Sequence, residues 1–514
     1  MSAKPQIVKT GQQRWENRHQ NFVQTLEGLY DLWNADTDDL IAGYNEMTRA
    51  IQEFIGQAIA DRTTVRALGA GWSLSRVAAT EGRMLNTKGL NWIFNLSGSS
   101  VSPQYSGSLQ HLVMAQCGVS IRELNVYLQK KNQGLPTSGA SNGQTIAGAL
   151  STGTHGSAFD VGSIPEYVAG LHLVTGPDRH IWLERASHPV VSDEMVQRLG
   201  AELLRDDALF NAALVSFGSF GFIHGILIET EDLYLLEGHR KIVPFDAPLR
   251  QLMGSLHFDG AALLPHQAER PCYFQTTVNP HDLDNGIFVN IKYKRPYHDG
   301  VRGFWDEFGP GDDLPAVLGT LGDVAPGLIP MAVKQVLQMQ YKTFSDQWGT
   351  PGETFSNSST RGKVLSAAVG IPLEAVNAAT DLLLDLNRRE GPFNGVFAHR
   401  YVRSTAATLG FTRFEPVTCV LELDGVISNS TLRFCEKAWD ALEAAGIPFT
   451  FHWGKLSVLH PARLERMYGD RVAAWKAARR QLLDPESLAV FTNRQMEEWG
   501  LGENGAAVAA PAVV

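Results

Sequence analysis

A glycine-rich run of small residues at positions 134–157 constrains the fold of this chain more than any other stretch. The run reads GLPTSGASNGQTIAGALSTGTHGS. Glycine allows tight turns and lets the backbone approach a ligand closely, and successive exposed amide groups form concave sites that hold phosphate oxygens. Ser138, Thr152 and Thr154 add hydroxyl donors. The run predicts an anion-binding cradle, and the alternative is a tight loop between strands.

A second glycine turn lies upstream, where residues 64–74 read TVRALGAGWSL. A short apolar strand enters a Gly-x-Gly turn at Gly69 and Gly71. The third glycine and the acidic residue of a dinucleotide-binding βαβ fingerprint are missing, so this turn does not by itself indicate a dinucleotide site. A tight loop explains it equally well when it is taken alone.

A third element begins with Leu209-Phe210 and ends in the turn GSFGFI at 218–223. In this order the three elements resemble the FAD-binding domain of the vanillyl-alcohol oxidase or PCMH superfamily, in which the first two clasp the FAD diphosphate. The sequence HWGK at 452–455 is similar to the H-W-[AG]-K motif of the branch with aldonolactone, alditol and type II cholesterol oxidases. The resemblance implies an α+β fold, in which an antiparallel-sheet substrate (cap) domain is inserted into a two-part PCMH-type FAD-binding domain.

The resemblance assigns FAD binding to the two glycine stretches, to the third element and to a C-terminal segment similar to the family's ending. The residues concerned are Leu68, Gly69, Ala70, Gly71, Trp72, Ser73, Ser138, Gly139, Gly143, Gly148, Gly153, Thr154, His155, Gly156, Ile223 and Asn493. For His155, in the Thr-His-Gly beside the diphosphate, we expect a structural hydrogen bond rather than chemistry.

Trp72 marks a departure from the family pattern. Many members hold FAD covalently through a histidine after the first glycine pair, and Trp72 occupies that position here. An indole has no nucleophilic ring nitrogen that could bond the flavin. The resemblance therefore implies that FAD is bound noncovalently.

The chain has 514 residues, which is too long for one ordinary hydrophobic core. We expect a helical N-terminal lead-in over 1–60 and an FAD-binding domain over 61–230. A substrate or cap domain is expected over 231–450, followed by a segment over 451–514 that returns to the FAD-binding domain. In the lead-in, large apolar residues between Trp15 and Trp33 follow near-helical spacing, and a second helix is expected over 38–60.

Hydrophobic periodicity predicts regular elements in both large domains. The expected strands are 112–117, 169–175, 287–293 and 417–423, and the expected helices are 120–132, 373–387 and 430–445. Residues 309–347 form an apolar excursion with glycine-proline turns. We favour a place for this excursion in the core of the cap over a place in the wall of a pocket.

Composition excludes several classes of protein. A net charge of −10 argues against a broad nucleic-acid interface. The four cysteines form no C-x-x-C pair and the histidines are not spaced as ligands, so we expect neither a metal site nor a disulfide framework. The N-terminus lacks an apolar signal region, and no apolar stretch is long enough to span a membrane. A cytoplasmic protein without a membrane partner is expected.

A flavin that oxidises an alcohol needs three things from its protein. They are a substrate C–H held over N5, a group that takes the hydroxyl proton, and positive charge near the N1–C2 carbonyl. By resemblance to the alditol oxidases, Arg400 and Lys455 are retained, whereas the family's acidic residue is replaced by Ala398.

Three further residues are candidate catalytic groups. Glu422, on the expected strand 417–423, could supply the missing carboxylate, and the alternative is a solvated surface glutamate. His399 could act as a base, because imidazole titrates near neutral pH, or could be an ordinary hydrogen-bonded surface group. His452 could act as a base or could orient Lys455.

The serine that contacts polyols in the alditol oxidases is replaced by Ala140. With two polar contacts missing, we expect a weakly hydroxylated, bulkier and more apolar substrate of small to medium size. The features together predict an FAD-dependent oxidoreductase that oxidises a CH–OH group by hydride transfer to flavin N5. The alternatives are a biosynthetic flavoprotein that catalyses a cyclisation or another non-alcohol oxidation, and a dehydrogenase with a non-oxygen acceptor.

Gly139 bears on the electron acceptor. In the aldonolactone branch this position is often glycine in oxidases and bulkier in dehydrogenases. A glycine leaves a gap of about one methyl group beside the flavin, where O₂ must arrive. We therefore expect an oxidase that produces hydrogen peroxide, and the alternative is that Gly139 serves only the conformation of a turn.

Overall fold

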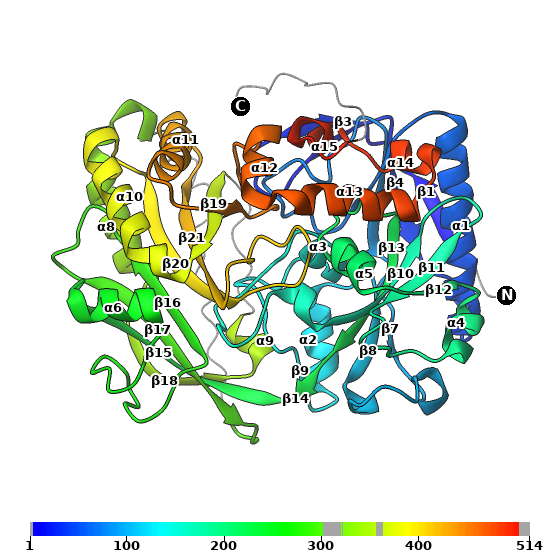
Figure 1. Cartoon of the computed structure of the whole chain (residues 1–514), viewed down its shortest axis with the longest axis horizontal. Helices are drawn as coiled ribbons and strands as arrows, with labels where there is room; N and C mark the ends of the chain where they lie inside the picture. The colour runs from blue at the N-terminus through cyan, green and yellow to red at the C-terminus, as the bar shows by residue number, and fades with distance from the viewer. Residues whose placement is uncertain (1–3, 302–319, 321, 356–362, 503–514) are drawn as a thin grey trace.

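The chain folds into two domains that lie side by side (Figure 1). The computed structural model describes residues 4–301, 320, 322–355 and 363–502. The base domain contains the chain up to about residue 232 and the segment after residue 451, and the cap domain contains the residues between. This arrangement confirms the expected α+β fold, in which an antiparallel-sheet domain interrupts a two-part base.

The base domain contains two main sheets. The first has the order β1 (Gln6–Lys9), β4 (Gly28–Trp33), β6 (Arg83–Gly89) and β5 (Val65–Leu68). The second has the order β12 (Glu202–Arg205), β11 (His180–Glu184), β10 (Val168–Val174), β13 (Phe222–Glu229), β8 (Leu112–Gln116) and β7 (Ile93–Asn95). The helices are α1 (Leu40–Ala60), α2 (Ile121–Gln129), α3 (Ile146–Ser151), α4 (Asp193–Leu199) and α5 (Asp207–Leu214). The strands expected at 112–117 and 169–175 and the helix expected at 120–132 are thus confirmed.

The helical lead-in expected over 1–60 is only partly right. α1 confirms the second helix, but residues 6–33 form strands β1, β2 (Arg14–Glu16), β3 (Val23–Thr25) and β4. β4 is an inner strand that pairs antiparallel with β1 and parallel with β6, with Gly28 opposite Arg83. Pairing with a strand about fifty residues away outweighs the local helical spacing, because propensity is a weak prior in a tertiary context.

The cap domain is built on one antiparallel sheet. Its order is β18 (Phe344–Gly349), β15 (Tyr234–Val243), β17 (Ile287–Pro296), β16 (Tyr273–Val278), β20 (Gly395–Arg403), β21 (Val417–Val426), β19 (Val364–Pro372) and β22 (Thr450–Phe451). Helices α6 (Ala247–Ser255), α10 (Val376–Glu390) and α11 (Asn429–Ala444) cover one face. The two strands and two helices expected in this domain are confirmed.

The other face of the cap sheet is turned toward the base domain and toward α8 (Ile329–Gln340). Successive side chains of a strand point to opposite faces. On β20, Val396 therefore packs beside α8, whereas Phe397 packs against Phe434 of α11. The short elements β9 (Gln133–Gly134), β14 (Glu231–Asp232) and α9 (Pro351–Thr354) lie where the two domains meet.

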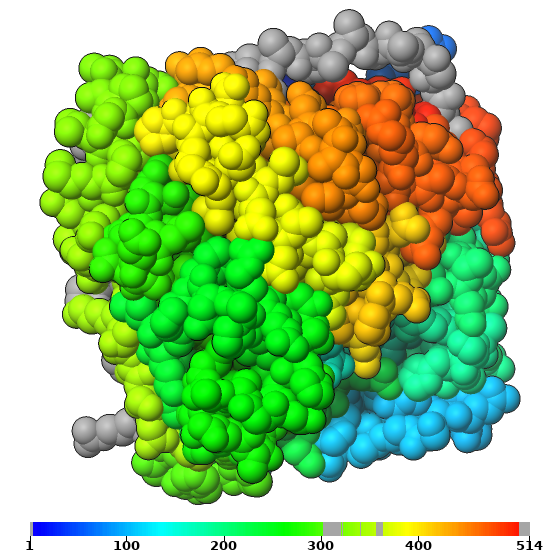
Figure 2. Space-filling model, turned by 60° about the vertical axis from the view of Figure 1, so that its left-hand side comes forward, coloured from blue at the N-terminus to red at the C-terminus, as the bar shows by residue number. Residues whose placement is uncertain are grey.

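The C-terminal segment returns to the base, as expected for residues from 451 onward. Helices α12 (Pro461–Tyr468), α13 (Asp470–Leu482), α14 (Pro485–Val490) and α15 (Arg494–Trp499) lie over it in Figure 1. Trp475 of α13 donates to the Val215 carbonyl at 3.2 Å, and the buried Arg479 donates to the Ser219 carbonyl at 2.9 Å. In Figure 2 the green, yellow and orange atoms of the cap adjoin the base without a break. Within the described ranges, no helix combines the length and apolarity that crossing a bilayer requires.

Asn493 fixes this segment to the base and does not line the cavity described below. Its side-chain amide nitrogen faces the backbone carbonyls of Arg76, Val77 and Ala79 at 3.2, 3.1 and 2.9 Å. Its carbonyl oxygen caps α15 by accepting from the Met496 amide at 3.1 Å. The cofactor role expected for Asn493 is therefore replaced by a structural one.

We predict that Asn493→Ala lowers the stability of the fold by about 2 kcal/mol or more, because it removes a helix cap and a donor to buried carbonyls. Asn493→Asp keeps the cap but turns a second oxygen toward those carbonyls, so it should be at least as destabilised. Urea unfolding of both variants measures the effect. Wild-type stability in Asn493→Asp would show that the cap alone matters.

Candidate active site

One cavity of about 590 Å³ lies between the base and cap domains. The base contributes the turn at 65–74, the glycine-rich run and the turn at 217–223. The cap contributes residues of β19, β20, β21 and α8. The cavity is therefore closed by parts of the chain as far apart in sequence as Trp15 and Phe491.

Most of the expected cofactor residues line this cavity. They are Leu68, Gly69, Ala70, Gly71, Trp72, Ser73, Gly139, Gly148, Thr154, His155 and Ile223. Thr145, which was not expected, joins the two glycine stretches: a Cβ atom on Gly69 would lie 2.1 Å from Thr145 Oγ1, and that oxygen accepts from the Gly148 amide at 3.4 Å. Thr145 could have been noticed in the sequence, because threonine is a preferred N-cap residue and stands just before the helix α3.

Gly148 leaves the backbone of α3 open to the cavity. A Cβ atom there would meet only Thr145 Oγ1 within 4 Å, at 3.1 Å. The residue is exposed although it lies inside the molecule, because the cavity borders it. A diphosphate can approach the backbone at this point, so the residues present fit the cradle expected for FAD.

Four residues of the glycine-rich run do not line the cavity and serve packing of the loops instead: Ser138, Gly143, Gly153 and Gly156. A Cβ atom on Gly143 would lie 2.5 Å from the Trp72 ring, and one on Gly156 would lie 2.6 Å from the Ser138 carbonyl oxygen. Gly153 has a φ of +70°, and a Cβ atom there would lie 3.5 Å from Phe411 Cδ1. The sequence alone could not distinguish these glycines from the glycines that border the cavity.

Glu422 forms a buried cluster with the two expected cations. Its side chain is 0% exposed, and its Oε2 lies 2.8 Å from Arg400 Nε, an ion pair whose alignment is not that of a hydrogen bond. Lys455 Nζ donates to the other oxygen, Oε1. Glu422 is directly opposite Ala398 in the β20–β21 register, so a carboxylate lies on the partner strand beside that position. The alternative of a solvated surface glutamate is excluded.

The cluster is held in its ionised form. Burial by itself raises the pKa of the Glu422 carboxyl, but the charges of Arg400 and Lys455 outweigh burial and hold that pKa well below its usual range. One carboxylate between two cations leaves one net positive charge at the cavity wall. This is the place where the chain can stabilise negative charge on a bound group.

Asp424, two residues further along β21, is a second carboxyl group on the same face of the strand. Burial and the neighbouring Glu422 charge raise its pKa. Ser366 donates to its Oδ1 at 2.6 Å. Sequence reasoning missed Asp424, although its spacing from Glu422 was the signal that could have found it.

Two histidines on the base side of the cavity are neutral at neutral pH. Burial, with the charges of Arg400 and Lys455, lowers the pKa of His155 to about 3. Burial and the charge of Lys455 lower the pKa of His452 well below its usual range. His452 Nδ1 accepts from the Gly454 amide at 3.0 Å, which fixes the turn that carries Lys455.

His399, by contrast, is not brought to the cavity. It lies on the opposite face of β20, fully buried between Thr276 and Thr380, whose hydroxyl oxygens are each 2.9 Å from a ring nitrogen. Thr380 donates its own proton to the Val376 carbonyl, so it accepts from His399 Nε2–H. Alternation along the strand places Arg400 in the cavity and the residue before it among the helices.

Helix α8 forms an apolar wall of the cavity. Val333, Val336 and Leu337 line it together with Tyr341, whereas Met331 and Met339 are 56% and 60% exposed. The excursion expected at 309–347 therefore contributes to the pocket rather than only to the core. Positions 309–319 and 321 of that excursion lie outside the described residues.

Comparisons with known proteins point to the same family as the sequence motifs do. Residues 45–183 match the family model described as FAD binding domain. The fold is similar to that of a cholesterol oxidase variant from Brevibacterium sterolicum, with a TM-score of 0.68 and 16% identity. The similarity covers 96% of this chain and 97% of the cholesterol oxidase. The resemblance inferred from the sequence is thus confirmed.

The sequence is similar to aldonolactone oxidases and dehydrogenases. An L-gulono-1,4-lactone dehydrogenase of Mycobacterium tuberculosis is 28% identical over 86% of this chain and 92% of its own length. A D-arabinono-1,4-lactone oxidase of Yarrowia lipolytica is 22% identical over 80% of this chain and 87% of its own. For a putative D-arabinono-1,4-lactone oxidase of Neurospora crassa, the match covers 51% of this chain and only 42% of the relative, at 24% identity.

We predict that His399 makes the protein sensitive to acid without taking part in chemistry. Burial lowers its pKa from 6.5 to about 4, so the unfolded chain binds the extra proton between these values. Stability from this residue is present above pH 6.5 and falls by about 2 kcal/mol between pH 7 and pH 5. Urea unfolding with excess FAD should show a smaller loss in His399→Gln than in wild type.

His257→Gln is the matched control, because the His257 side chain is 69% exposed. It should keep the wild-type dependence on pH. Equal slopes in wild type and His399→Gln, or a pH profile of flavin reduction altered in His399→Gln, would contradict this assignment.

Proposed function

We propose that the protein is an FAD-dependent oxidoreductase that oxidises a CH–OH group of a weakly hydroxylated substrate. The observation that carries the proposal is the Glu422–Arg400–Lys455 cluster in the same cavity as the glycine cradle. Bound FAD would accept the hydride, which is chemistry that no side chain can supply. The residues of the chain would bind and orient the substrate and would accept its hydroxyl proton.

Arg400 and Lys455 would hold negative charge at the cavity wall once Asp424 has taken up a proton, because these two cations, Glu422 and the neutral Asp424 then carry one net positive charge that bulk water does not screen. Glu422 keeps both cations in place and is a poor proton acceptor, because its pKa is far below neutral. Asp424 is the better acceptor for a hydroxyl proton, because burial and the Glu422 charge raise its pKa, whereas that of Glu422 is lowered. We assign the proton transfer to Asp424.

The cavity wall favours a substrate with an apolar body and one polar end. Val333, Val336 and Leu337 of α8 face the cavity, and Ala398 and Ala140 replace polar residues of the alditol oxidases. The relatives named for aldonolactones make a lactone or another cyclic alcohol the first compounds to test. A flavoprotein that oxidises no alcohol is the second candidate, because those two replacements remove polyol contacts.

We infer that FAD is bound noncovalently and that the protein is cytoplasmic. Trp72 stands where many relatives carry the linking histidine, and its indole is enclosed by Arg18 and Gly143. The free cysteines, three of them buried, suit a reducing compartment. His19 and Cys117 also line the cavity and are the residues to examine if a covalent bond exists.

The proposed function predicts that two variants lose different properties: one reduces its flavin slowly, and the other does not hold FAD. Lys455→Met should stay yellow, because Arg400 still neutralises Glu422, but anaerobic flavin reduction by an alcohol substrate should slow by roughly 10²-fold. Gly148→Leu should be colourless, because its side chain enters the cradle, while Gly148→Ala should keep more FAD. Stopped-flow absorbance measures the rate of flavin reduction, and the flavin content of the purified protein measures FAD binding. Acid precipitation should release all the flavin.

Three results would contradict these assignments. Unchanged reduction in Lys455→Met would remove the lysine from the site. Full FAD occupancy in Gly148→Leu would place the cofactor elsewhere. A yellow wild type that no alcohol or lactone bleaches would favour the second candidate function.

We propose O₂ as the electron acceptor, supported by Gly139 at the cavity and by relatives named as oxidases. The space expected beside Gly139 is partly filled, because a Cβ atom there would lie 2.9 Å from Thr154 Cγ2. Gly139→Ala alone would therefore displace Thr154. The clean comparison is Thr154→Ser with and without Gly139→Ala.

We predict that reduced Thr154→Ser reacts rapidly with O₂, and that adding Gly139→Ala slows reoxidation at least about tenfold at equal FAD occupancy, because the added methyl occupies space beside the flavin. Stopped-flow mixing with oxygenated buffer measures both rates. Slow reoxidation of the wild type with fast transfer to a quinone would instead make the protein a dehydrogenase, as one relative is named.

A further inference from the structure

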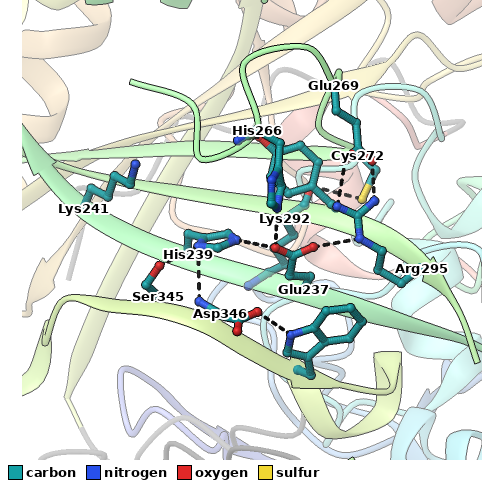
Figure 3. Close-up of polar contacts among 12 residues, drawn as sticks. Glu237, His239, Lys241, His266, Glu269, Cys272, Lys292, Arg295, Ser345 and Asp346 are labelled. Carbon is teal, nitrogen blue, oxygen red and sulfur yellow. Dashed lines mark hydrogen bonds and ion pairs between the residues drawn. The ribbon is translucent and has the colours of Figure 1, made fainter. Parts of the chain in front are cut away.

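A second polar cluster lies in the cap domain (Figure 3). Glu237 and His239 are two residues apart on β15 and point to the same face, and His266 reaches them from the loop after α6. Glu237 Oε1 lies 2.9 Å from His239 Nε2 and 2.5 Å from His266 Nε2. None of these three residues lines the cavity between the base and cap domains.

The geometry points to a transition-metal site, and we propose that Glu237, His239 and His266 bind Zn²⁺. One atom from each residue lies within 4.8 Å of the other two. Two imidazole nitrogens and one carboxylate oxygen are a frequent ligand set for zinc with an open fourth position. The His266 side chain is 42% exposed, so water can complete the coordination from that side.

The residues around the cluster support this ligand arrangement. Arg295 Nε donates to the other carboxylate oxygen, Glu237 Oε2, at 2.7 Å, which leaves Oε1 for the metal. Ser345 Oγ is 3.0 Å from His239 Nδ1 and can accept its proton. Metal ligands are held by outer partners of this kind, which orient them and fix the ring tautomer.

Binding requires rearrangement of protons and of one bond. Without metal, both Nε2 atoms contact Glu237, and the Asp346 amide donates to His239 Nδ1 at 3.2 Å. Zn²⁺ would replace the proton on each coordinating Nε2 atom, and each proton moves to the Nδ1 of its ring or leaves to solvent. A proton on His239 Nδ1 would replace the hydrogen bond from the Asp346 amide. Affinity should therefore fall as the pH is lowered, because the ligands must be deprotonated.

The site would fasten the loop after α6 to the cap sheet. His266 and Glu269 both belong to this loop, and Glu269 pairs with Arg295 of β17. A metal bound to His266 and to two residues of β15 would add a link that exists only in the folded state, so it would stabilise the fold. Residue spacing does not reveal this site, because the third ligand is distant along the chain and only the fold brings it near.

The test is Zn²⁺ binding to chelator-treated protein without a histidine tag, measured by calorimetry and by the thermal midpoint. We expect one Zn²⁺ per chain and a raised midpoint in wild type. Ser345→Ala should bind roughly 10- to 100-fold more weakly, as expected for loss of an outer partner. His266→Ala should lose more than that and should keep the wild-type flavin content and reduction rate.

His257→Ala is the matched control, because His257 lies near the start of the same loop and outside the cluster. It should bind Zn²⁺ like wild type. Mg²⁺ should raise no midpoint, because it prefers oxygen ligands. Absence of Zn²⁺ binding in wild type, or equal binding in wild type and His266→Ala, would overturn the proposal.

Discussion

The buried carboxylate of Glu422 is the interaction on which the arrangement of the two domains depends. It joins Arg400 of the cap sheet to Lys455, which follows the last cap strand where the chain turns back to the base. The same turn is fixed to the base, since the Leu74 amide donates to the Gly454 carbonyl at 2.8 Å and Ser75 Oγ donates to the Trp453 carbonyl at 2.6 Å. Burial of three charges is unfavourable unless each is paired, so this contact fixes where the cap can sit.

The register of β21 decides which chemistry faces the cavity. Glu422 and Asp424 point into it, while Leu421 and Leu423 point toward the helices on the other face. A slip of one residue would exchange these sets and bury both carboxylates among apolar side chains. Because Glu422 is directly opposite Ala398, its carboxylate lies beside Arg400, two residues further along β20.

Elements with strong hydrophobic periodicity and the glycine-rich part of the cavity could be predicted from the sequence, whereas contacts between distant segments could not. α1, α10 and β21 agree with their hydrophobic patterns, and the glycine stretches line the cavity as the resemblance implied. β4 became a strand because one of its partners, β6, lies about fifty residues further along the chain, whereas β2 and β3 pair with each other. His399 and Arg400 are neighbours in sequence, yet only the sheet determines which of them reaches the cavity. The Asn493 amide shows the same limit, because the carbonyls it binds lie about 415 residues away.

The pairing within the cluster also limits what the cavity can bind. Both oxygens of Glu422 are engaged by Arg400 and Lys455, so this carboxylate has little capacity left to accept from a substrate hydroxyl. Asp424 and Ser366 remain as polar groups on the cap side, beside the apolar wall of α8. A ligand with many hydroxyl groups would bury several of them without a partner, each at about 1 to 3 kcal/mol. The proposed substrate, with one hydroxyl directed at Asp424 on an otherwise apolar body, avoids that cost.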